Sequence, residues 1–376
     1  MIVACLLLAA LPPLDGVAVP YYPREGAPFP PDLAEVRALG ARGILVPNPF
    51  VLAGPTAAGP RSGPDTLSAT QVLALAKAAK AEGLAWVYMP FLTLAEGSAA
   101  DWRGNLRPAD PEEWWRSYQQ LLVQAAELAQ RGEASGLVIG SELSSLSGEG
   151  TEGRWAQSAA VARRLFGGPL IYAANHDAVH HTAPYGSVDI IGVSAYHALS
   201  SDPDAGVEVL VKRWRGIAHG LAELSLRHQK PVWVVELGYP SRDGAAVRPW
   251  DYGSGGVLDL EEQRAAYFAA TLALSQTPEV EAVFFWQWHG TGGSLDRGYS
   301  VRGKPAERVL RRYFQARASM EPRPDHRQHP GHRQGAHLGP FGDHLRQLGP
   351  QPQAEQVPEA DGPGQDPGLG QQLGRK

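Results

Sequence analysis

The sequence of 376 residues contains one cysteine, Cys5, so an internal disulfide and a structural thiolate zinc site are both excluded. Charge of either sign is scarce. The 34 basic and 39 acidic residues give a formal net charge of −5, and the basic ones are scattered. This distribution does not favour a nucleic acid or an anionic membrane surface as a partner. No glycine-rich phosphate-binding motif follows the first apolar run, so we expect no nucleotide cofactor.

The N-terminus also lacks an apolar run long enough to span a bilayer. Residues 1–13, MIVACLLLAALPP, resemble the apolar part of a secretory signal without its basic start. The run from Ile2 to Cys5 is similar to a lipoprotein cleavage site, although no apolar stretch precedes it. We interpret the segment as the remnant of a signal or lipoprotein leader, which favours an extracytoplasmic protein. The alternative is an ordinary lead-in to the first strand.

The other end of the chain has few large apolar residues. Residues 319–376 are rich in proline, glycine, glutamine, arginine and histidine. Such a segment buries too little surface to offset its chain entropy, so we predict a disordered tail. Its histidines, at positions 326, 329, 332, 337 and 344, allow loose metal binding as an alternative to a solvated tail.

Between these ends, residues 14–318 alternate short β-branched or aromatic runs with helical patterns, which is typical of a parallel sheet. Eight such runs begin at Gly16, Gly43, Leu84, Gly136, Pro169, Val188, Pro231 and Val280. Helix start signals lie between them at Asp32, Ser68, Asp110 and Asp259. Eight strand–helix units over this length predict one α/β domain, a (β/α)8 TIM barrel.

Two carboxylates end predicted strands. Glu142 closes the fourth run, GLVIGSEL, and Glu236 closes the seventh, PVWVVELGY. In a barrel these ends meet at the C-terminal mouth, and the fourth and seventh strands lie nearly opposite each other. One protonated and one ionised carboxyl group are what cleavage of a glycosidic bond requires. The alternative is that both glutamates pair with arginines at the rim.

Aromatic and amide side chains surround these positions. The eighth run ends in FFWQWHG, and alternation predicts that Trp286 and Trp288 both face the barrel interior, unless one of them caps the core. Flat indoles suit the C–H faces of sugars. Tyr196 follows the sixth run and is placed to hydrogen-bond Glu236, and Asn175 closes the fifth. We also predict sugar platforms at the loop residues Trp102 and Trp250, although most such tryptophans seal a barrel rim.

Several segments, taken in order, resemble glycoside hydrolase family 113 over about residues 14–315. They are WRGNLRPADPEEWWRSYQQ, VIGSEL, YAANHD, DIIGVSAYH, VVELGYPSRDG, DLEEQRAAYF, FFWQWHG and GYSVRGKPAERVL. The resemblance implies a clan A barrel, a retaining mechanism and activity on β-1,4-mannans or manno-oligosaccharides. It also implies that Glu142 is the acid/base, that Glu236 is the nucleophile, and that Asn175, Tyr196, Trp286 and Trp288 line the cleavage subsite. We therefore expect a monomer whose partner is a polysaccharide or oligosaccharide.

The sequence departs from this family at three positions. Ser141 precedes the acid/base, where many clan A relatives have asparagine and this family often has threonine, a residue that matters for gripping the sugar's 2-hydroxyl. Met89 and Phe91 end the third strand, where relatives tend to carry a basic residue and a histidine. These changes put the identity of the sugar in doubt more than the mechanism.

Two other functions compete with hydrolysis by a carboxylate pair. A zinc hydrolase would use the i, i+4 pair His176 and His180 on one helical face, with His181 and Asp177 nearby, but the glutamate of HExxH is absent. We predict no metal. A carbohydrate-binding barrel without turnover is the second competitor, motivated by the changes on the third strand. The sequence does not distinguish cleavage within chains from cleavage at their ends.

Overall fold

Eight parallel strands close into a barrel, because the first strand, β1 (Gly16–Ala18), pairs with both the second and the last. The computed structural model describes residues 14–96, 101–251 and 256–319, so Cys5, the predicted leader and nearly all of the predicted tail lie outside the described residues. The barrel continues in chain order through β2 (Gly43–Leu52), β4 (Ala85–Leu94), β5 (Gly136–Ser141), β6 (Leu170–Asn175), β7 (Ile190–Ser194), β8 (Val232–Leu237) and β9 (Val280–Phe285). A two-residue strand, β3 (Arg61–Ser62), pairs antiparallel with the end of β2. The predicted TIM barrel is confirmed.

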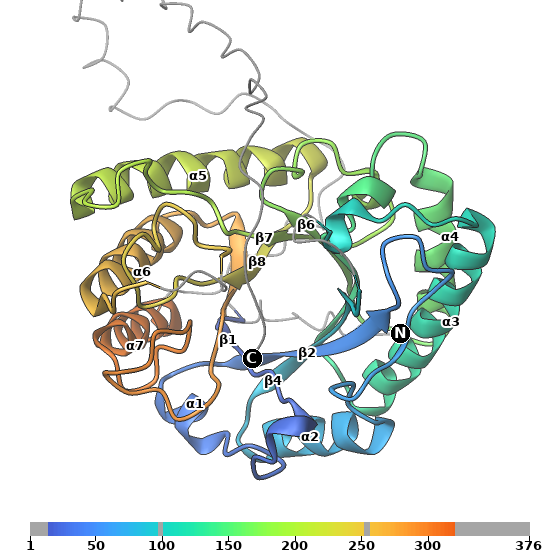
Figure 1. Ribbon diagram of the computed structural model, residues 1–376, viewed down its shortest axis with the longest axis horizontal. Coiled ribbons are helices and arrows are strands. Elements are labelled where there is room, and N and C mark those ends of the chain that lie inside the picture. The colour runs from blue at the N-terminus through green and yellow to red at the C-terminus, as the bar shows by residue number, and fades with distance from the viewer. Residues whose placement is uncertain (1–13, 97–100, 252–255, 320–376) are drawn as a thin grey trace, which may run out of the picture. The chain divides into compact units, whose positions relative to one another are not determined.

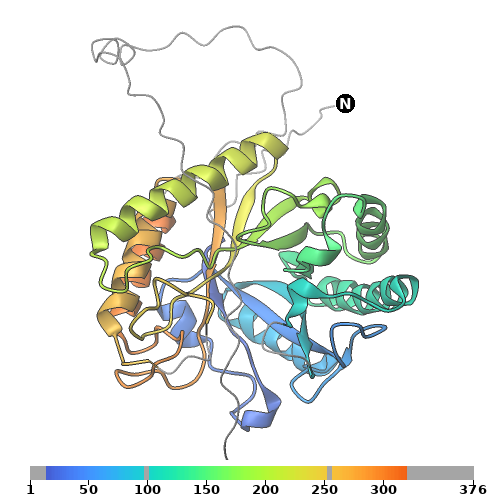
Figure 2. The same ribbon diagram turned by 45° about the horizontal axis from the view of Figure 1, so that its top comes forward.

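Helices surround the strands as an outer ring (Figures 1 and 2). They are α1 (Ala34–Ala38), α2 (Ala69–Ala81), α3 (Pro111–Arg131), α4 (Glu152–Arg163), α5 (Val207–His228), α6 (Leu260–Ser275) and α7 (Pro305–Ala318). The connection from β6 to β7 contains only a short 3-10 helix, η4 (Ala183–Gly186), so seven α-helices are present among the described residues. Three further 3-10 helices lie in loops: η1 (Pro23–Glu25), η2 (Arg103–Asn105) and η3 (Ser144–Leu146).

Three of the four predicted start signals are N-caps. Ser68 forms a capping box with Gln71, and Asp110 and Asp259 each accept hydrogen bonds from backbone N–H groups of the following turn. The fourth, Asp32, is not the cap: α1 begins after Leu33, and the Asp32 carboxylate accepts from the N–H of Ala34 at 2.9 Å. These caps set where the long helices begin.

Two apolar layers hold the barrel together. The larger lies between the strands and the helices, and the smaller fills the barrel interior. The interior layer consists of Ala18, Leu45, Val87, Met89, Val138, Ile171, Ala173, Ile190, Trp233, Val235, Ala282 and Phe284. Because side chains alternate along a strand, the next inward position on β6 after Ile171 and Ala173 is Asn175 at the mouth. Polar groups thus replace apolar ones where the strands end.

A buried ion pair closes the opposite end of the barrel. Asp15, just before β1, accepts from Nε of Arg317 in α7 at 2.8 Å, and their side chains are 2% and 5% exposed. Asp15 also accepts the backbone N–H of Val283 at 2.9 Å. The pair joins the first strand, the last strand and the last helix. No helix within the described ranges meets the length and hydropathy needed to cross a membrane.

Candidate active site

Glu142 lies directly after β5, with its side chain buried at the mouth of the barrel and 5% of the residue exposed. Its backbone N–H donates to the carbonyl of Ala173 on the neighbouring strand at 2.7 Å. The backbone of Glu142 is left-handed, with φ of 55°. A non-glycine residue in this region costs about 1–3 kcal/mol, and such strain is concentrated at functional sites. The backbone therefore turns sharply at the carboxylate that we predicted as catalytic.

Glu236 lies in β8, opposite Ser194 of β7, and is 4% exposed. The N–H of Ala195 donates to the Glu236 carbonyl at 2.7 Å, which fixes the backbone of the strand at this point. The hydroxyl of Tyr196 donates to Oε2 of Glu236 at 3.1 Å. The predicted hydrogen bond between these two side chains is present.

The two carboxylates interact electrostatically. Burial raises the pKa of Glu236 well above its ordinary value, and the negative charge of Glu142 raises it further. Arg103 and the Tyr196 hydroxyl act in the opposite direction by favouring the ionised form. Glu236 therefore retains its proton to higher pH than an exposed glutamate does.

Sequence analysis missed one charged residue of the site, Arg103. It belongs to η2, in the loop after β4, and its guanidinium contacts Oε2 of Glu142 at 2.6 Å. The side chain is only 16% exposed, and its Cζ lies 5.4 Å from the centre of the Phe91 ring. The sequence signal was its place beside Trp102 in the family-like segment WRGNLRPADPEEWWRSYQQ, which assigned no role to the arginine. That signal is weak, because nothing local indicates that the loop folds back over β5.

Trp286 and Trp288 lie in different layers. Trp286 is half-buried and packs against the interior layer of the barrel. Trp288 is 7% exposed and belongs to the larger apolar layer, where the guanidinium of Arg302 lies 5.7 Å from its ring centre. The alternative that one of the two indoles caps the core therefore holds for Trp288, and the expectation that both face the interior does not. Strand alternation does not extend to Trp288, because β9 ends at Phe285.

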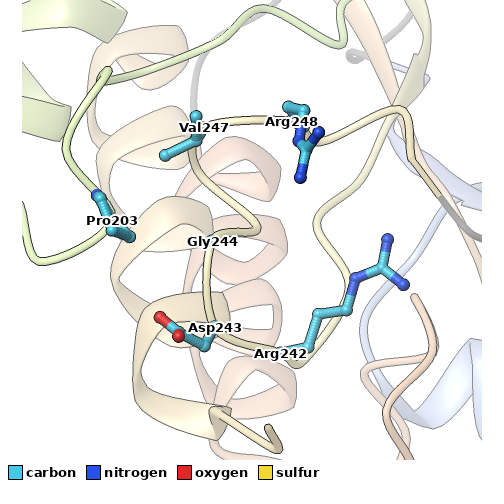
Figure 3. Close-up of a pocket in the computed structure, with 6 residues that line it drawn as sticks. All are labelled: Pro203, Arg242, Asp243, Gly244, Val247 and Arg248. Carbon is cyan, nitrogen blue, oxygen red and sulfur yellow. The ribbon is translucent and has the colours of Figure 1, made fainter. Parts of the chain in front are cut away.

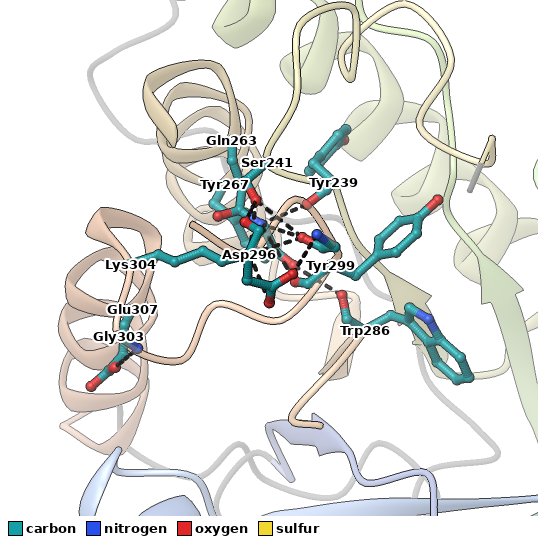
Figure 4. A network of polar contacts seen from close by, with 11 residues as sticks. Tyr239, Ser241, Gln263, Tyr267, Trp286, Asp296, Tyr299, Gly303, Lys304 and Glu307 are labelled. Atoms are coloured by element: carbon teal, nitrogen blue, oxygen red, sulfur yellow. Dashed lines mark hydrogen bonds and ion pairs between the residues drawn. The ribbon is translucent and has the colours of Figure 1, made fainter. Parts of the chain in front are cut away.

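A polar network lies behind Trp286 (Figure 4). The Tyr267 hydroxyl donates to the Trp286 carbonyl at 3.0 Å, and Gln263 donates to the carbonyl of Tyr239 at 2.9 Å. Nζ of Lys304 lies 2.8 Å from the Ser241 hydroxyl, and its side chain is fully buried. The network ties the loops after β8 and β9 to α6 and to the N-cap of α7, so the backbone that carries the indole is held in place.

Trp250 forms a ledge at the rim. It is 43% exposed, and its indole stacks on the ring of His176 with 5.6 Å between centroids and 22° between planes. Asn175 lies beside this ledge and is 9% exposed. Its amide nitrogen donates to Asp177 at 2.8 Å, and its oxygen lies 3.1 Å from Nδ1 of His176. These bonds orient the amide and leave part of its hydrogen-bonding capacity for a ligand.

Trp102 lies on the other flank and is partly exposed. Its indole folds over Gly104, where an added Cβ would lie 2.2 Å from Cζ2 of the ring. A glycine is therefore required at this position for the tryptophan to adopt its place next to Arg103.

The histidine-rich segment after β6 does not support the zinc alternative. Residues 176–180 form turns rather than a helix, so His176 and His180 do not share a helical face. Across the ranges that the structure describes, no group of three histidine, cysteine or acidic side chains is arranged to hold a metal ion.

A separate pocket of about 380 Å³ lies between the loop after β8 and Pro203 of the loop after β7 (Figure 3). It is lined by Pro203, Arg242, Asp243, Gly244, Val247 and Arg248. Neither carboxylate of the candidate site contributes to it.

Comparisons with known proteins point to one family. The family model described as Glycoside Hydrolase Family 113 matches residues 61–304. A family 113 β-mannanase from Alicyclobacillus acidocaldarius, solved in complex with ManMIm, is 27% identical, with a TM-score of 0.70 over 82% of this chain and 98% of that one. A second family 113 β-1,4-mannanase structure is 20% identical, with a TM-score of 0.71 over 81% and 99%. An enzyme of glycoside hydrolase family 5, subfamily 18, from Streptomyces cattleya shares the fold at 18% identity and a TM-score of 0.56, over 84% and 83%. No curated protein sequence matches this chain.

Proposed function

This chain belongs to glycoside hydrolase family 113 and is a glycosidase, and we propose that it cleaves β-1,4-linked mannan or manno-oligosaccharides by a retaining, double-displacement mechanism. The observation that carries the proposal is the buried pair Glu142 and Glu236, on strands from opposite sides of the barrel and coupled through their charges. The substrate class rests on the β-mannanases to which the chain is similar.

In this mechanism Glu142 is the acid/base and Glu236 the nucleophile. Glu142 donates a proton to the leaving oxygen while Glu236 attacks the anomeric carbon, so the glycosidic bond breaks and a glycosyl ester forms. Water then attacks the same carbon, Glu142 accepts its proton, and the ester bond breaks. Tyr196 positions Glu236 through its 3.1 Å hydrogen bond.

The remaining predicted residues bind the sugars. We assign Trp286 and Asn175 to the subsite where the bond breaks, because one offers a flat apolar face at the interior layer and the other an oriented amide. Trp250 and Trp102 flank the mouth from two different loops and extend the surface on which further sugar units can stack. Trp288 supports the β9 loop from within the larger apolar layer.

Product analysis on mannan, glucomannan, cellulose and xylan tests the proposal. We expect manno-oligosaccharides from the first two, and NMR during the first turnovers should show the β-anomer, which a retaining enzyme releases. Glu236→Ala should abolish turnover, and azide should restore it with formation of the α-glycosyl azide. The exposed Glu223→Ala is the matched control and should retain activity. Binding of manno-oligosaccharides without any hydrolysis would instead establish the carbohydrate-binding alternative.

Export belongs to the proposal as well, because a polysaccharide substrate does not enter a cell intact. The basis is the apolar N-terminal segment, residues 1–13, which lies outside the described residues. Mass spectrometry of the mature N-terminus from culture fractions would distinguish a cleaved leader, a lipidated Cys5 and an uncleaved chain.

A further inference from the structure

We propose that Arg103 is a positioning residue that decides which of the two carboxylates holds the shared proton, and that substrate entry must break its ion pair with Glu142. This inference rests on the proposed function, because it concerns how the same carboxylate pair becomes ready to react. Arg103 lies in the segment WRGNLRPADPEEWWRSYQQ, which carries part of the family resemblance, but the resemblance gave it no role. The proposed role follows from the geometry of the loop after β4.

The contact is direct and mostly removed from water. Nη2 of Arg103 lies 2.6 Å from Oε2 of Glu142, and the two side chains are 16% and 7% exposed. On its other side the guanidinium lies 5.4 Å from the centre of the Phe91 ring. At a partly buried site a charge-assisted hydrogen bond of this length strongly favours the ionised carboxylate.

Among the described residues whose pKa values respond to the charge of Glu142, none is a second cation. Burial lowers the pKa of His176, which senses the charge of Glu142, so its ring is neutral at pH 7. Burial raises the pKa of Tyr172, and the charge of Glu142 raises it further, so this side chain is a neutral phenol. Glu236 is the facing acidic group on β8. Of these described groups and Arg103, Arg103 alone carries the positive charge that balances the carboxylate pair.

This arrangement is the reverse of the one that the reaction needs. In the proposed resting state the 2.6 Å contact with Arg103 stabilises the charge of Glu142, and the shared proton lies on the buried Glu236. Glycosyl transfer to Glu236 requires the proton on Glu142 and the negative charge on Glu236. The proton must leave Glu236 and arrive on Glu142, and one negative charge moves the opposite way, so the net charge of the pair is unchanged. A sugar whose leaving oxygen occupies the place of the guanidinium would promote this exchange.

Two substitutions separate charge from shape. Arg103→Met removes the charge but keeps an unbranched chain against Phe91, and Arg103→Lys keeps the charge. Arg107→Met is the matched control, because Arg107 lies in the same loop, pairs with Asp101 at 2.9 Å and has a side chain that is 61% exposed. For each variant, kcat/KM for a manno-oligosaccharide is measured across the pH range, together with its melting temperature. If Arg103→Met does not fold, Arg103→Gln serves the same purpose.

Arg103 lowers the pKa of Glu236, so without this cation the carboxylate pair should lose its shared proton only at higher pH. We expect both limbs of the pH profile of Arg103→Met to move upward by about one pH unit or more, since a nearby opposite charge has an effect of this size. Arg103→Lys should restore the position of the limbs, and Arg107→Met should not move them.

Three outcomes would overturn the inference. If kcat/KM of Arg103→Met falls at every pH while the limbs of its pH profile stay in place, Arg103 has a purely structural role. A change in KM alone would show a role in sugar binding. If the wild-type enzyme hydrolyses none of the four polysaccharides, the proposed function fails and this inference fails with it. This outcome is distinct from the first two, which are measured on variants of an active enzyme.

Discussion

Two buried arginine–carboxylate pairs lie at opposite ends of this barrel, and they differ in what surrounds them. At the closed end, Arg317 and Asp15 meet at 2.8 Å with side chains 5% and 2% exposed. At the mouth, Arg103 and Glu142 meet at 2.6 Å with side chains 16% and 7% exposed. The ion pairs are chemically alike, so their separate roles must come from their neighbours.

The pair at the closed end is completed by protein groups. The Asp15 carboxylate accepts from the N–H of Val283 at 2.9 Å, and Arg317 donates to the carbonyls of Val280 at 3.1 Å and Glu281 at 3.3 Å. The pair at the mouth instead faces a second ionisable carboxylate, Glu236. A buried ion pair closed by fixed dipoles is structural, whereas one beside a second carboxylate can be rebalanced by a ligand.

Glu142→Gln should have the largest effect and tests the functional half of the comparison. Turnover of manno-oligosaccharides should fall by about 10⁴-fold, because the leaving oxygen loses its proton donor. Cleavage of a dinitrophenyl mannoside, whose leaving group needs no proton, should fall far less in its first step. Asp15→Asn is the matched variant at the closed end of the barrel. The turnover number of its folded molecules should equal that of the wild type. Equal losses for both substrates would contradict the role assigned to Glu142.

Arg317→Met should have the next largest effect and tests the structural half. Removing one partner of a buried ion pair leaves an uncompensated charge on Asp15, so we expect the free energy of unfolding to fall by about 3–5 kcal/mol. Chemical denaturation followed by circular dichroism measures this change. Arg103→Met should cost less, because the side chains at the mouth are closer to water. A larger loss for the mouth variant would reverse the comparison.

Glu236→Gln removes the proposed nucleophile, but its effect on stability should be the smallest of the three, and stabilising. The pKa of Glu236 is higher in the folded chain than its value near 4.5 in the unfolded chain, so between these two pH values the folded chain binds more protons. The free energy of unfolding therefore falls as the pH rises from about 4.5 through the folded-state pKa. The amide removes this loss. We expect the variant to melt about 2–4 °C above the wild type at pH 8 and with no difference below pH 4. The exposed Glu223→Gln should not change the melting temperature at pH 8, and a Glu236→Gln variant less stable than the wild type at that pH would refute the raised pKa.

Much of the barrel could be predicted from local patterns. The apolar runs at Gly136 and Pro231 became β5 and β8 because buried parallel strands are apolar on both faces, and Ser68 capped its helix because the bond it makes is local. The error at Trp288 has a similarly local cause, since an alternation rule applies only while the strand continues. The connection between β6 and β7 lacks an α-helix, which the count of strand–helix units did not indicate.

The site was only partly predictable. Glu142 and Glu236 were found because each ends a strand, and the barrel topology brings strand ends together. The stacking of Trp250 on His176 and the contact of Arg103 with Glu142 join loops that are far apart in the sequence. Their partners depend on loop paths, which no periodicity describes. The roles of these residues, the retaining outcome, the monomeric state and export stay predictions.

By itself, the order of apolar runs and polar strand ends determined the barrel and the positions of its two carboxylates, because burial of apolar surface and the spacing of side chains along a strand are properties of short segments. Only the tertiary structure decided the charge that faces each carboxylate. Coulomb interactions between groups 39 or more residues apart depend on distance in space and on exclusion of water, and both come into being only when the chain has folded.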